Sequence, residues 1–531
     1  MSKRTATELE PTKSIGAPFQ KASGSGQRRE NVTVDEMGEF EDAWEDEIES
    51  DEDVVDAEAQ GEDGALEHTC ECIDTDIFVG MEVDEVLPAI EESEEPQPAP
   101  EAFIPGHHIL GKDEILEPDD SVYIMRHAMN VNWPCLSFDV LRDNLGDERQ
   151  RYPATTYIVG GTQADTAKNN ELIVYKMSSL HKTQKDGGMS VAESEDEEDD
   201  DDDDALDEDA VLEHKTIPHF GGVNRTRAQP LPTGSPLPPI SQPYHVATWA
   251  ETGKVHIWNV RPLIEALEVP GYAYNKAQIQ TPVFTINSHG RAEGFAMDWA
   301  SSGLSSLRLL TGDVHSKIYL TTASPSGFTA LAQPFLSHTS SVEDIQWSPS
   351  EPTIFASCSA DRSIQIWDVR SKGRKSVAGI LSAHESDVNV ISWNRTTTYL
   401  LVSGGDEGGI KTWDLRNVKK KGSSDPDPTP VAHFSWHSQP ITSIEWHPTE
   451  DSIFVASGAD DQVTIWDLAV EQDTEETGMD DTPGGKEVPP QLLFVHQGQK
   501  DVKEVHWHPQ IPGTVVSTAS DGFNVFKTIS V

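Results

Sequence analysis

Histidine, hydroxyl and carboxylate side chains, which carry acid–base and nucleophilic catalysis in many enzymes, recur in a fixed order along this chain. The first set comprises His338, Ser357 and Asp361, and it is followed by Trp367. A catalytic constellation would occur once, whereas this set returns twice at similar spacing, as His384, Ser403, Glu407 and Trp413, and as His437, Ser457, Asp460 and Trp466. Buried groups of these types are tolerated only when they bond to one another. We therefore predict structural hydrogen-bonded chains rather than catalytic sites, and we expect no enzyme activity.

Two pairs of histidines could bind a metal ion, but their surroundings favour other roles. His506 and His508 alternate along a predicted strand, so both imidazoles would lie on one face. Pro509 follows them, as a proline follows the matching tryptophans of earlier repeats, which indicates a turn between strands. His107-His108 lies beside Gly and Pro and is typical of an exposed loop. The cysteines fit neither a disulfide framework nor a zinc pattern, and no Gly-rich phosphate loop is present, so we expect no metal and no cofactor.

The spacing of the aromatic residues indicates a repeated all-β unit. In the three sets above, one Trp follows the His by 9 residues, and a second Trp, which precedes Asp, follows it by 29. Short runs rich in β-branched and aromatic residues, at 342–347, 353–358 and 363–368, are separated by turn residues. A repeat of 46 to 53 residues with an early His and a late Trp-Asp is the signature of WD-repeat β-propeller blades.

Looser copies of the pattern raise the number of predicted blades to seven. Two sets keep the order of the polar residues: His289, Asp313 and Tyr319, and His496, Asp521 and Phe526. His127 and Gly161 indicate a divergent first blade. We place one aromatic residue on the third strand of each blade: Tyr175, Trp258, Tyr319, Trp367, Trp413, Trp466 and Phe526. Only five residues follow the last of these, so we expect Ser121–Ala128 to supply the final strand and close the ring.

Charge divides the chain into a ring and acidic appendages. The formal net charge is −53, of which residues 1–120 contribute −29 and residues 181–214 contribute −14. Such charged runs cannot bury enough apolar surface to fold. We therefore predict a disordered acidic tail over residues 1–105 and a seven-bladed propeller over residues 106–531. A disordered acidic insertion at 181–214 and an acidic loop at 471–488 would interrupt that propeller.

The acidic segments predict capture of a strongly basic partner, with plain solubilisation as the alternative. Residues 39–58 hold 12 carboxylates without Lys or Arg, and residues 193–209 hold 14 carboxylates. Phe40, Trp44 and Ile48 are spaced four apart, so a helix would align them to bind a client or the propeller itself. This charge would repel phosphates, so we expect no direct sequence-specific binding of nucleic acid. The candidate client-binding residues here are Glu39, Glu41, Asp42, Trp44, Glu45, Asp46, Glu47, Glu195, Asp199 and Asp204.

Five motifs together resemble the glutamate-rich WD-repeat proteins over essentially the whole chain. They are FEDAWEDE at 40–47, WPCLSFD at 133–139, GGTQ at 160–163, ELIVYKM at 171–177 and SGGDEG at 403–408. The resemblance implies a eukaryotic ribosome-biogenesis factor that acts as a dedicated chaperone. Its client would be a newly made basic protein of the large ribosomal subunit, the third in the universal numbering, which it would deliver to pre-60S particles.

The chain is also similar to the broader histone-binding WD-repeat family, at Trp133–Leu136 and at Pro489–His496. In that family a helix before the first blade and an acidic loop hold a basic histone helix. By this resemblance the loop residues that would contact a client are Asp473, Glu475, Glu476, Asp480 and Asp481. Pro and Gly within 103–112 do not predict the long helix, which favours the ribosomal-protein client over histones.

Two alternatives remain: a histone chaperone, and a substrate receptor of a cullin ubiquitin ligase. The second rests on Arg370 and Arg416, each two residues after Trp-Asp, although an Arg there also bonds locally to blade loops. No stretch approaches the ~18 apolar residues that span a membrane, and the first residues lack the apolar core of a signal peptide. We expect a soluble monomer in the nucleus and nucleolus, with the cytoplasm as a further location. Import would be aided by Lys3-Arg4, Arg28-Arg29 and the lysines at 419–421.

Overall fold

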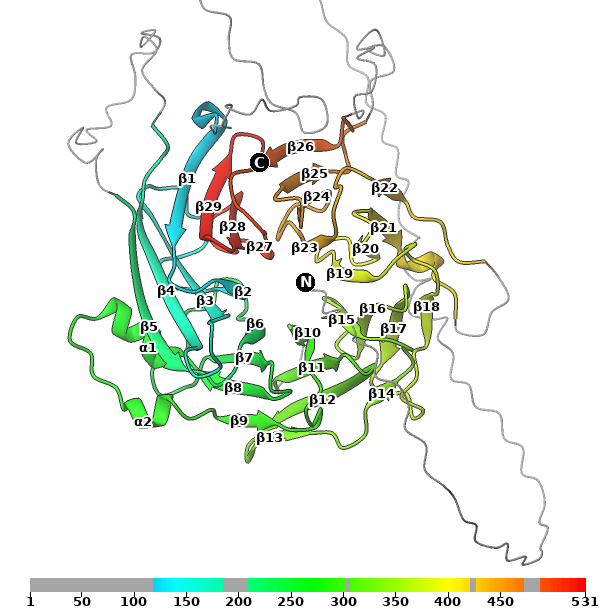
Figure 1. The fold of residues 1–531 in the computed structure, drawn as a ribbon, viewed down its shortest axis with the longest axis horizontal. Coiled ribbons are helices and arrows are strands. Elements are labelled where there is room, and N and C mark those ends of the chain that lie inside the picture. The colour runs from blue at the N-terminus through cyan, green and yellow to red at the C-terminus, as the bar shows by residue number, and fades with distance from the viewer. Residues whose placement is uncertain (1–117, 185–208, 302–305, 421–425, 472–487) are drawn as a thin grey trace, which may run out of the picture. The chain divides into compact units, whose positions relative to one another are not determined.

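The computed structural model describes residues 118–184, 209–301, 306–420, 426–471 and 488–531. Within these ranges the chain forms seven antiparallel β-sheets that stand side by side around a central axis, as Figure 1 shows. Six of these sheets have four strands and one has five. This is the nearly all-β, seven-bladed propeller that the repeat spacing predicts. No helix in the described ranges is long and apolar enough to cross a membrane.

Blades are numbered here by the chain order of their innermost strands. Blade 1 contains β2 (Cys135–Leu141), β3 (Ala154–Thr162), β4 (Glu171–Leu180) and β5 (Val211–Pro218). Blade 2 contains β6 (Val223–Ala228), β7 (His245–Ala250), β8 (Val255–Asn259) and β9 (Phe284–Ile286), with α1 (Arg261–Glu268) and α2 (Lys276–Ile279) before β9. Blade 3 contains β10 (Gly294–Trp299), β11 (Arg308–Asp313), β12 (Lys317–Ser324), β13 (Gly327–Ala330) and β14 (Phe335–Leu336).

The remaining blades match the regular repeats. Blade 4 contains β15 (Val342–Trp347), β16 (Ile354–Ser359), β17 (Ile364–Asp368) and β18 (Ala378–Ile380). Blade 5 contains β19 (Val388–Trp393), β20 (Leu400–Gly405), β21 (Ile410–Asp414) and β22 (Ala432–Phe434), with the short helix η3 (Leu415–Asn417). Blade 6 contains β23 (Ile441–Trp446), β24 (Ile453–Gly458), β25 (Val463–Asp467) and β26 (Leu492–His496). All seven predicted aromatic residues lie on third strands.

Blade 7 closes the ring with strands from both ends of the sequence. It contains β27 (Glu504–Trp507), β28 (Thr514–Ala519), β29 (Gly522–Thr528) and, after the short helix η1 (Asp120–Val122), β1 (Tyr123–Asn130). β1 pairs antiparallel with β29, and this confirms the predicted closing strand. The placement of His127 in the first blade is wrong, because His127 lies on β1. Its Nε2 lies 2.9 Å from the carbonyl oxygen of His181.

Apolar side chains fill the space between neighbouring blades. One cluster joins Leu310 of blade 3 to Phe355 and Trp367 of blade 4. The rings of Phe355 and Trp367 stack with their centroids 5.6 Å apart. The close approach of adjacent blades also requires glycine on some second strands, since a side chain at Gly161 would collide with Val223 of the next blade. Each sheet is therefore stabilised by its neighbours, which explains why the repeats fold together.

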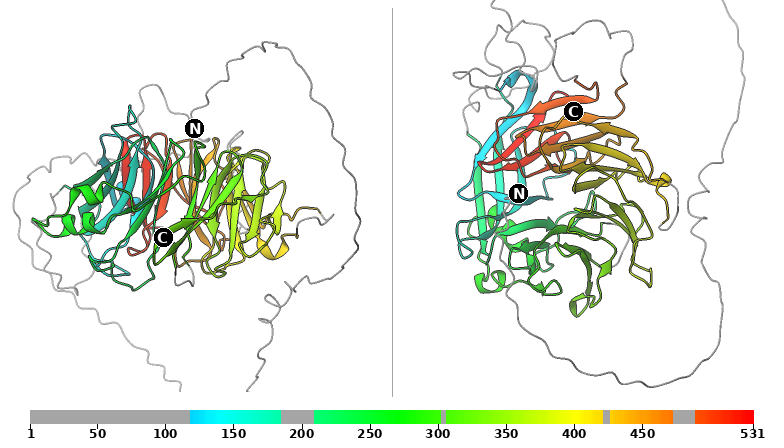
Figure 2. Two further views of the ribbon diagram at one scale, coloured as in Figure 1. Left: turned by 90° about the horizontal axis from the view of Figure 1, so that it is seen from below. Right: turned by 45° about the vertical axis from the view of Figure 1, so that its right-hand side comes forward.

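Both predicted insertions and the start of β1 lie on the same face of the ring. Because strands alternate in direction within a blade, the first-to-second and third-to-fourth connections lie at one edge of every sheet. We call the face formed by these edges the insertion face. One insertion joins β4 to β5 and the other joins β25 to β26, so both are third-to-fourth connections. The chain enters β1 from this face too, because Tyr123 pairs with Thr528 at the end of β29. Figure 2 shows the ring from two further directions.

Candidate functional site

The polar residues of blades 4 and 5 form the predicted hydrogen-bonded chains. In blade 4, Trp367 Nε1 donates to Ser357 Oγ at 2.8 Å. His338 then lies 2.7 Å from Ser357 Oγ through Nε2 and 3.0 Å from Asp361 Oδ2 through Nδ1. Blade 5 repeats this chain at 2.8, 2.7 and 2.5 Å through Trp413, Ser403, His384 and Glu407. Burial alone would raise the pKa of Asp361, but the His338 bond lowers it. Each hydroxyl is held between an indole and an imidazole, which indicates a bracing role.

In blade 6 the chain uses a different hydroxyl from the predicted one. His437 Nδ1 lies 2.9 Å from Asp460 Oδ1, as predicted. Its Nε2 lies 2.9 Å from Thr464 Oγ1, which also accepts from Trp466 Nε1 at 2.8 Å. Ser457 instead bonds to a hydroxyl on β23, so the prediction for this residue is wrong. The reason is geometric: hydroxyls on the second and third strands can both reach the buried space beside the tryptophan.

In blade 7 the partner of the histidine comes from the other end of the sequence. His496 Nδ1 lies 2.7 Å from the hydroxyl of Tyr123 on β1. The ring of Phe526 stacks on His496 with a centroid separation of 4.0 Å. The predicted pairing of His496 with Asp521 is therefore wrong, because the tyrosine takes the place of the carboxylate. Spacing could not reveal this pair, which is separated by 373 residues.

Blade 2 contains a set that the sequence analysis missed. Trp258 Nε1 donates at 2.9 Å to Thr248 Oγ1, which lies 3.1 Å from His219 Nε2. This histidine precedes its tryptophan by 39 residues rather than 29, because a Pro-rich segment lengthens the connection between β6 and β7. Blade 3 keeps the predicted pair, with His289 Nδ1 2.8 Å from Asp313 Oδ2.

The inner strands carry a second repeated pattern along the central channel. Near the end of five inner strands, a side-chain oxygen accepts a hydrogen bond from a backbone N–H of the next blade. These bonds join Ala228 to Asp139 (2.8 Å), Trp347 to Asp298 (2.7 Å), Trp393 to Gln346 (2.8 Å), Trp446 to Ser392 (3.1 Å) and Trp507 to Glu445 (3.0 Å). Polar side chains at the channel therefore satisfy buried donors and join the blades.

A buried ion cluster spans three blades at the channel wall. Glu504 of blade 7 lies 2.8 Å from Arg225 and 2.7 Å from Arg227, both on β6 of blade 2. The same carboxylate accepts from the backbone N–H of Phe138 in blade 1 at 2.8 Å. Only 1% of the Glu504 side chain is exposed. The cluster therefore holds blades 7, 1 and 2 together beside the point where the ring closes.

Burial and neighbouring charges shift the titration of this cluster. Burial alone would lower the pKa of His506, but Glu445 and Glu504, which lie 2.9 and 3.6 Å away, raise it to about 10. Burial raises the pKa of Asp298 to about 7, against the opposing effects of the Trp347 N–H and the Arg227 charge. At neutral pH the imidazole is thus charged, while Asp298 is close to its titration midpoint.

The channel widens into a funnel of about 480 Å³ on the insertion face. Its rim includes first-to-second connections, among them Ser301, Pro349 and Pro448. Carboxylates and arginines from several blades line the wall: Asp139, Asp298, Asp344, Glu445, Arg142, Arg225, Arg227 and Arg395. Several of these charges already bond to neighbouring blades, so the funnel wall primarily braces the ring.

The two histidines considered as metal ligands have separate partners. His506 is paired with Glu445, whereas His508 Nδ1 accepts from the backbone N–H groups of Gln510 and Ile511 at 3.0 Å each. The second group is the turn that follows the strand, as the proline predicts. Within the part of the chain that the structure describes, no group of three or more His, Cys, Asp or Glu residues is arranged to hold a metal ion.

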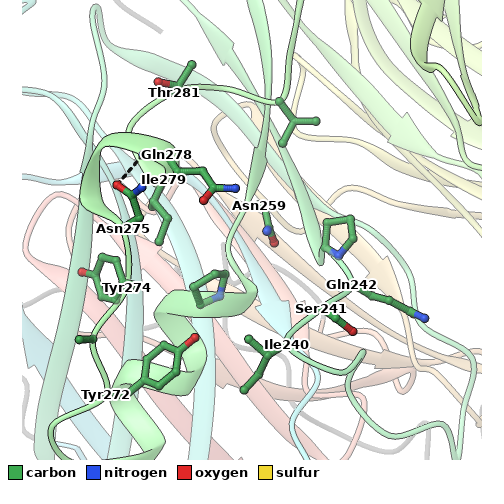
Figure 3. Close-up of a pocket in the computed structure, with 14 residues that line it drawn as sticks. Ile240, Ser241, Gln242, Asn259, Tyr272, Tyr274, Asn275, Gln278, Ile279 and Thr281 are labelled. Carbon is green, nitrogen blue, oxygen red and sulfur yellow. Dashed lines mark hydrogen bonds between the residues drawn. The ribbon is translucent and has the colours of Figure 1, made fainter.

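A separate pocket of about 490 Å³ lies at the outer part of blade 2. Figure 3 shows Tyr272, Tyr274 and Ile240 in its lining, together with the amide side chains of Asn275 and Gln278. Its lining contains no acidic or basic side chain. The pocket therefore has no charge with which to hold a strongly basic client.

The fifteen candidate client-binding residues all lie outside the described residues. They are Glu39, Glu41, Asp42, Trp44, Glu45, Asp46, Glu47, Glu195, Asp199, Asp204, Asp473, Glu475, Glu476, Asp480 and Asp481. The structure does place the chain that flanks them. The insertion of blade 1 is shorter than the predicted 181–214, because Val211–His214 already belong to β5. Its ends and those of the loop in blade 6 open on the insertion face.

The arginines behind the ubiquitin-ligase alternative are bonded to the aspartates of their own repeats. Arg370 pairs with Asp368, and Arg416 with Asp414, at 2.8 Å in each case. The guanidinium of Arg416 also lies 3.7 Å from the ring centroid of Tyr399. Both arginine side chains remain more than half exposed, at 67% and 52%. The geometry thus supports the local role that the sequence analysis considered for them.

Comparison with known proteins adds family models to this geometry. Residues 330–368, 375–414 and 428–467 match the model described as "WD domain, G-beta repeat". Residues 113–181 match the model of the histone-binding protein RBBP4 and its counterpart in the CAF1 complex. The first three ranges coincide with blades 4, 5 and 6 and the connections before them. The last range spans β1 and most of blade 1.

Three relatives are similar over most of their length. "Ribosome assembly protein rrb1" of Schizosaccharomyces pombe is 45% identical over 533 residues, and the alignment covers 100% of both chains. "Protein HEAT STRESS TOLERANT DWD 1" of Arabidopsis thaliana is 44% identical, over 83% of this chain and 93% of its own. "Glutamate-rich WD repeat-containing protein 1" of Dictyostelium discoideum is 44% identical, over 79% and 83%. With identity of this level across ring and appendages, the chain belongs to the family of glutamate-rich WD-repeat proteins that includes these relatives.

Proposed function

We propose that this protein is a ribosome-assembly factor that chaperones a newly made basic protein of the large ribosomal subunit, the third in the universal numbering. The observation that carries the proposal is the 45% identity to a protein named for ribosome assembly, because that alignment covers both chains completely. It therefore includes the acidic segments as well as the propeller. The role is one of binding rather than catalysis, in keeping with polar residues that are bonded to one another in each blade.

The geometry supports a single client-binding side. The acidic insertions of blades 1 and 6 and the start of β1 all lie on the insertion face. Ribosomal proteins carry many Lys and Arg, which associate with stray RNA unless their charge is masked. Carboxylates collected on one face would mask that charge. Ribosomal RNA, with its denser phosphate charge, would then take over the client within the pre-60S particle. Such a role places the protein in the nucleus and nucleolus.

The client contacts in this proposal are the acidic residues that the sequence analysis selected. The tail would contribute the carboxylates at 39–47 together with Trp44, and the insertion of blade 1 would contribute the run from Glu195 to Asp204. The loop of blade 6 would contribute Asp473 to Asp481, with Pro489 at its base. Long-range attraction of this kind weakens as salt rises, because the screening length falls to ~8 Å at physiological ionic strength.

Binding measured with purified components tests this proposal. The full chain is titrated with the ribosomal protein at several salt concentrations, in the absence of RNA. We expect tight binding at physiological salt, with a dissociation constant that rises with ionic strength. A chain that binds this protein no better than an unrelated lysine-rich protein of equal charge would contradict the proposal.

A histone chaperone is the second candidate, because residues 113–181 match a histone-binding model. That match covers β1 and blade 1, next to the point where the tail enters the ring. The same titration with histones H3–H4 separates the two functions. Preference for the histones over the ribosomal protein at equal salt would establish this candidate in place of the first.

A further inference from the structure

Two basic segments lie side by side on blades 4 and 5 of this acidic protein. One follows β17 and the other follows β21, and their cationic residues are Arg370, Lys372, Arg374, Lys375, Arg416, Lys419 and Lys420. We call these seven residues the basic patch. The two segments are joined directly, because Lys419 O accepts from the N–H of Gly379 at 3.3 Å and Lys420 forms an isolated β-bridge with Ala378. β17, β18, β21 and β22 are neighbours in Figure 1.

The basic patch faces solvent and keeps an excess of positive charge. Six of its residues are exposed, and Arg374 is half-buried. Among the described residues, four nearby carboxylates offset part of its charge: Asp368 and Asp414, which pair with Arg370 and Arg416, Glu351, which lies within the field of Arg370, and Asp427, which bonds to the N–H of Ser382. Seven cations against these four carboxylates leave an excess of three positive charges on this small surface.

This surface lies on the same side of the ring as the entry of the amino-terminal tail. Both basic segments are third-to-fourth connections, and β1 also begins on the insertion face. Residues 39–58 of the tail contain 12 carboxylates without Lys or Arg. About 60 residues separate them from Pro118, and a flexible segment of that length has a root-mean-square span of ~45 Å. The tail is therefore long enough to reach blades 4 and 5.

From this placement we infer that residues 39–58 bind the basic patch when no client is present. The tether gives this acidic segment an effective concentration of about a millimolar at the patch. RNA is the weaker competitor for the same cations, since a chain with a net charge of −53 repels free phosphates. A basic client must then displace the patch from the same carboxylates, so weakly basic proteins are excluded. This docking does not depend on the identity of the client.

Carbodiimide crosslinking of the full chain, without client or RNA, tests the inference. Carboxylates of 39–58 should crosslink to Lys375 and Lys420 about fivefold more often than to Lys168 and Lys500, which are exposed on the opposite face. At about 0.5 M salt, where the screening length falls to ~4 Å, the preference should disappear.

Matched charge reversals separate the patch from general electrostatics. Lys372→Glu with Lys419→Glu changes the basic patch and leaves Lys375 and Lys420 as reporters. Lys254→Glu with Lys317→Glu makes the same change of charge on the opposite face, where both lysines are exposed. We expect the first pair to abolish the preferential crosslinks and the second pair to preserve them, with both variants folded by circular dichroism.

Two results would overturn the inference. The first is equal crosslinking of residues 39–58 to lysines of both faces in the native chain. The second is crosslinking that the patch variant does not change, while that variant alone loses binding to a single-stranded RNA oligonucleotide. The second result would make the patch an RNA-binding surface. Neither outcome bears on whether a ribosomal protein is the client, because no client is present in the experiment.

Discussion

Glu504 of blade 7 and Arg227 of blade 2 form a 2.7 Å ion pair that passes the intervening blade 1. These residues are separated by 277 positions, and both lie at the central channel. Blade 7 is the blade assembled from both ends of the sequence, where β1 pairs with β29. The ring is therefore closed twice, by a strand at its outer edge and by an ion cluster at its centre.

Replacing the buried carboxylate of this cluster should weaken the whole ring. Glu504→Gln keeps the shape of the side chain but leaves Arg225 and Arg227 without their main counter-charge. We expect the free energy of unfolding, measured with urea, to fall by about 3 kcal/mol, as for other broken buried pairs. Asp501→Asn is the matched control, since Asp501 pairs with Lys503 while 56% exposed. Its effect should stay below about 1 kcal/mol, and equal losses for both variants would refute the bracing role.

The exchanged hydroxyl of blade 6 predicts unequal effects for two neighbouring substitutions. Thr464→Val leaves the buried Trp466 N–H and His437 without their shared partner, which should cost about 1–3 kcal/mol of unfolding free energy. Ser457→Ala removes a hydroxyl outside this chain and should cost about 1 kcal/mol or less. In blade 4 the order is reversed, because there Ser357 is the central hydroxyl. A larger loss for Ser457→Ala than for Thr464→Val would contradict the structure.

The raised pKa of Asp298 predicts a dependence of stability on pH. Its folded-state pKa is about 7, above the ordinary value of 3.8, so the folded protein binds a proton more tightly than the unfolded chain. Stability therefore declines as pH rises from about 4 to 7 and levels off above that range. Asp298→Asn removes this decline and retains an acceptor for the Trp347 N–H.

The pH effect is best measured as a difference between two proteins. The unfolding free energy of Asp298→Asn, relative to the native protein, should increase between pH 5 and pH 8. Other titrating groups, among them His506, are common to both proteins and cancel in the difference. A difference that stays constant across this range would show that Asp298 does not titrate there.

The acidic run of blade 1 should affect binding without affecting the fold. Replacing residues 199–204 by Asn and Ser removes six carboxylates from a segment between β4 and β5. We expect the thermal unfolding temperature to remain nearly unchanged, while affinity for the basic client falls at low salt. Calorimetry and a binding titration measure the two quantities. Equal affinity of altered and native chains would show that the run serves as a spacer.

The ring could be predicted from the sequence because its signals are local. Trp367, Trp413 and Trp466 keep a constant distance from their histidines, and short alternating runs mark the strands between them. Their hydrogen-bond partners in blades 4 and 5 follow at equally regular positions. Regular spacing fails where an insertion lengthens a connection, as before Trp258, whose partner His219 was therefore missed.

The channel cluster could not be predicted, because its contacts join residues from different blades. Glu504 meets Arg225 and Arg227 only after seven sheets have closed into a ring. Tyr123 likewise replaces an expected carboxylate beside His496 because the two ends of the chain share one blade. The proposed client contacts are predicted from composition alone, since the residues concerned lie outside the described structure.

Purification of the chain from cells, followed by nuclease treatment and mass identification of the bound proteins, tests the central claim most directly. The account predicts that one basic protein of the large ribosomal subunit, the third in the universal numbering, is recovered in near-equal amount with the chain. It also predicts that this protein persists after RNA is removed. Recovery of no basic ribosomal protein, even at low salt, would contradict the account.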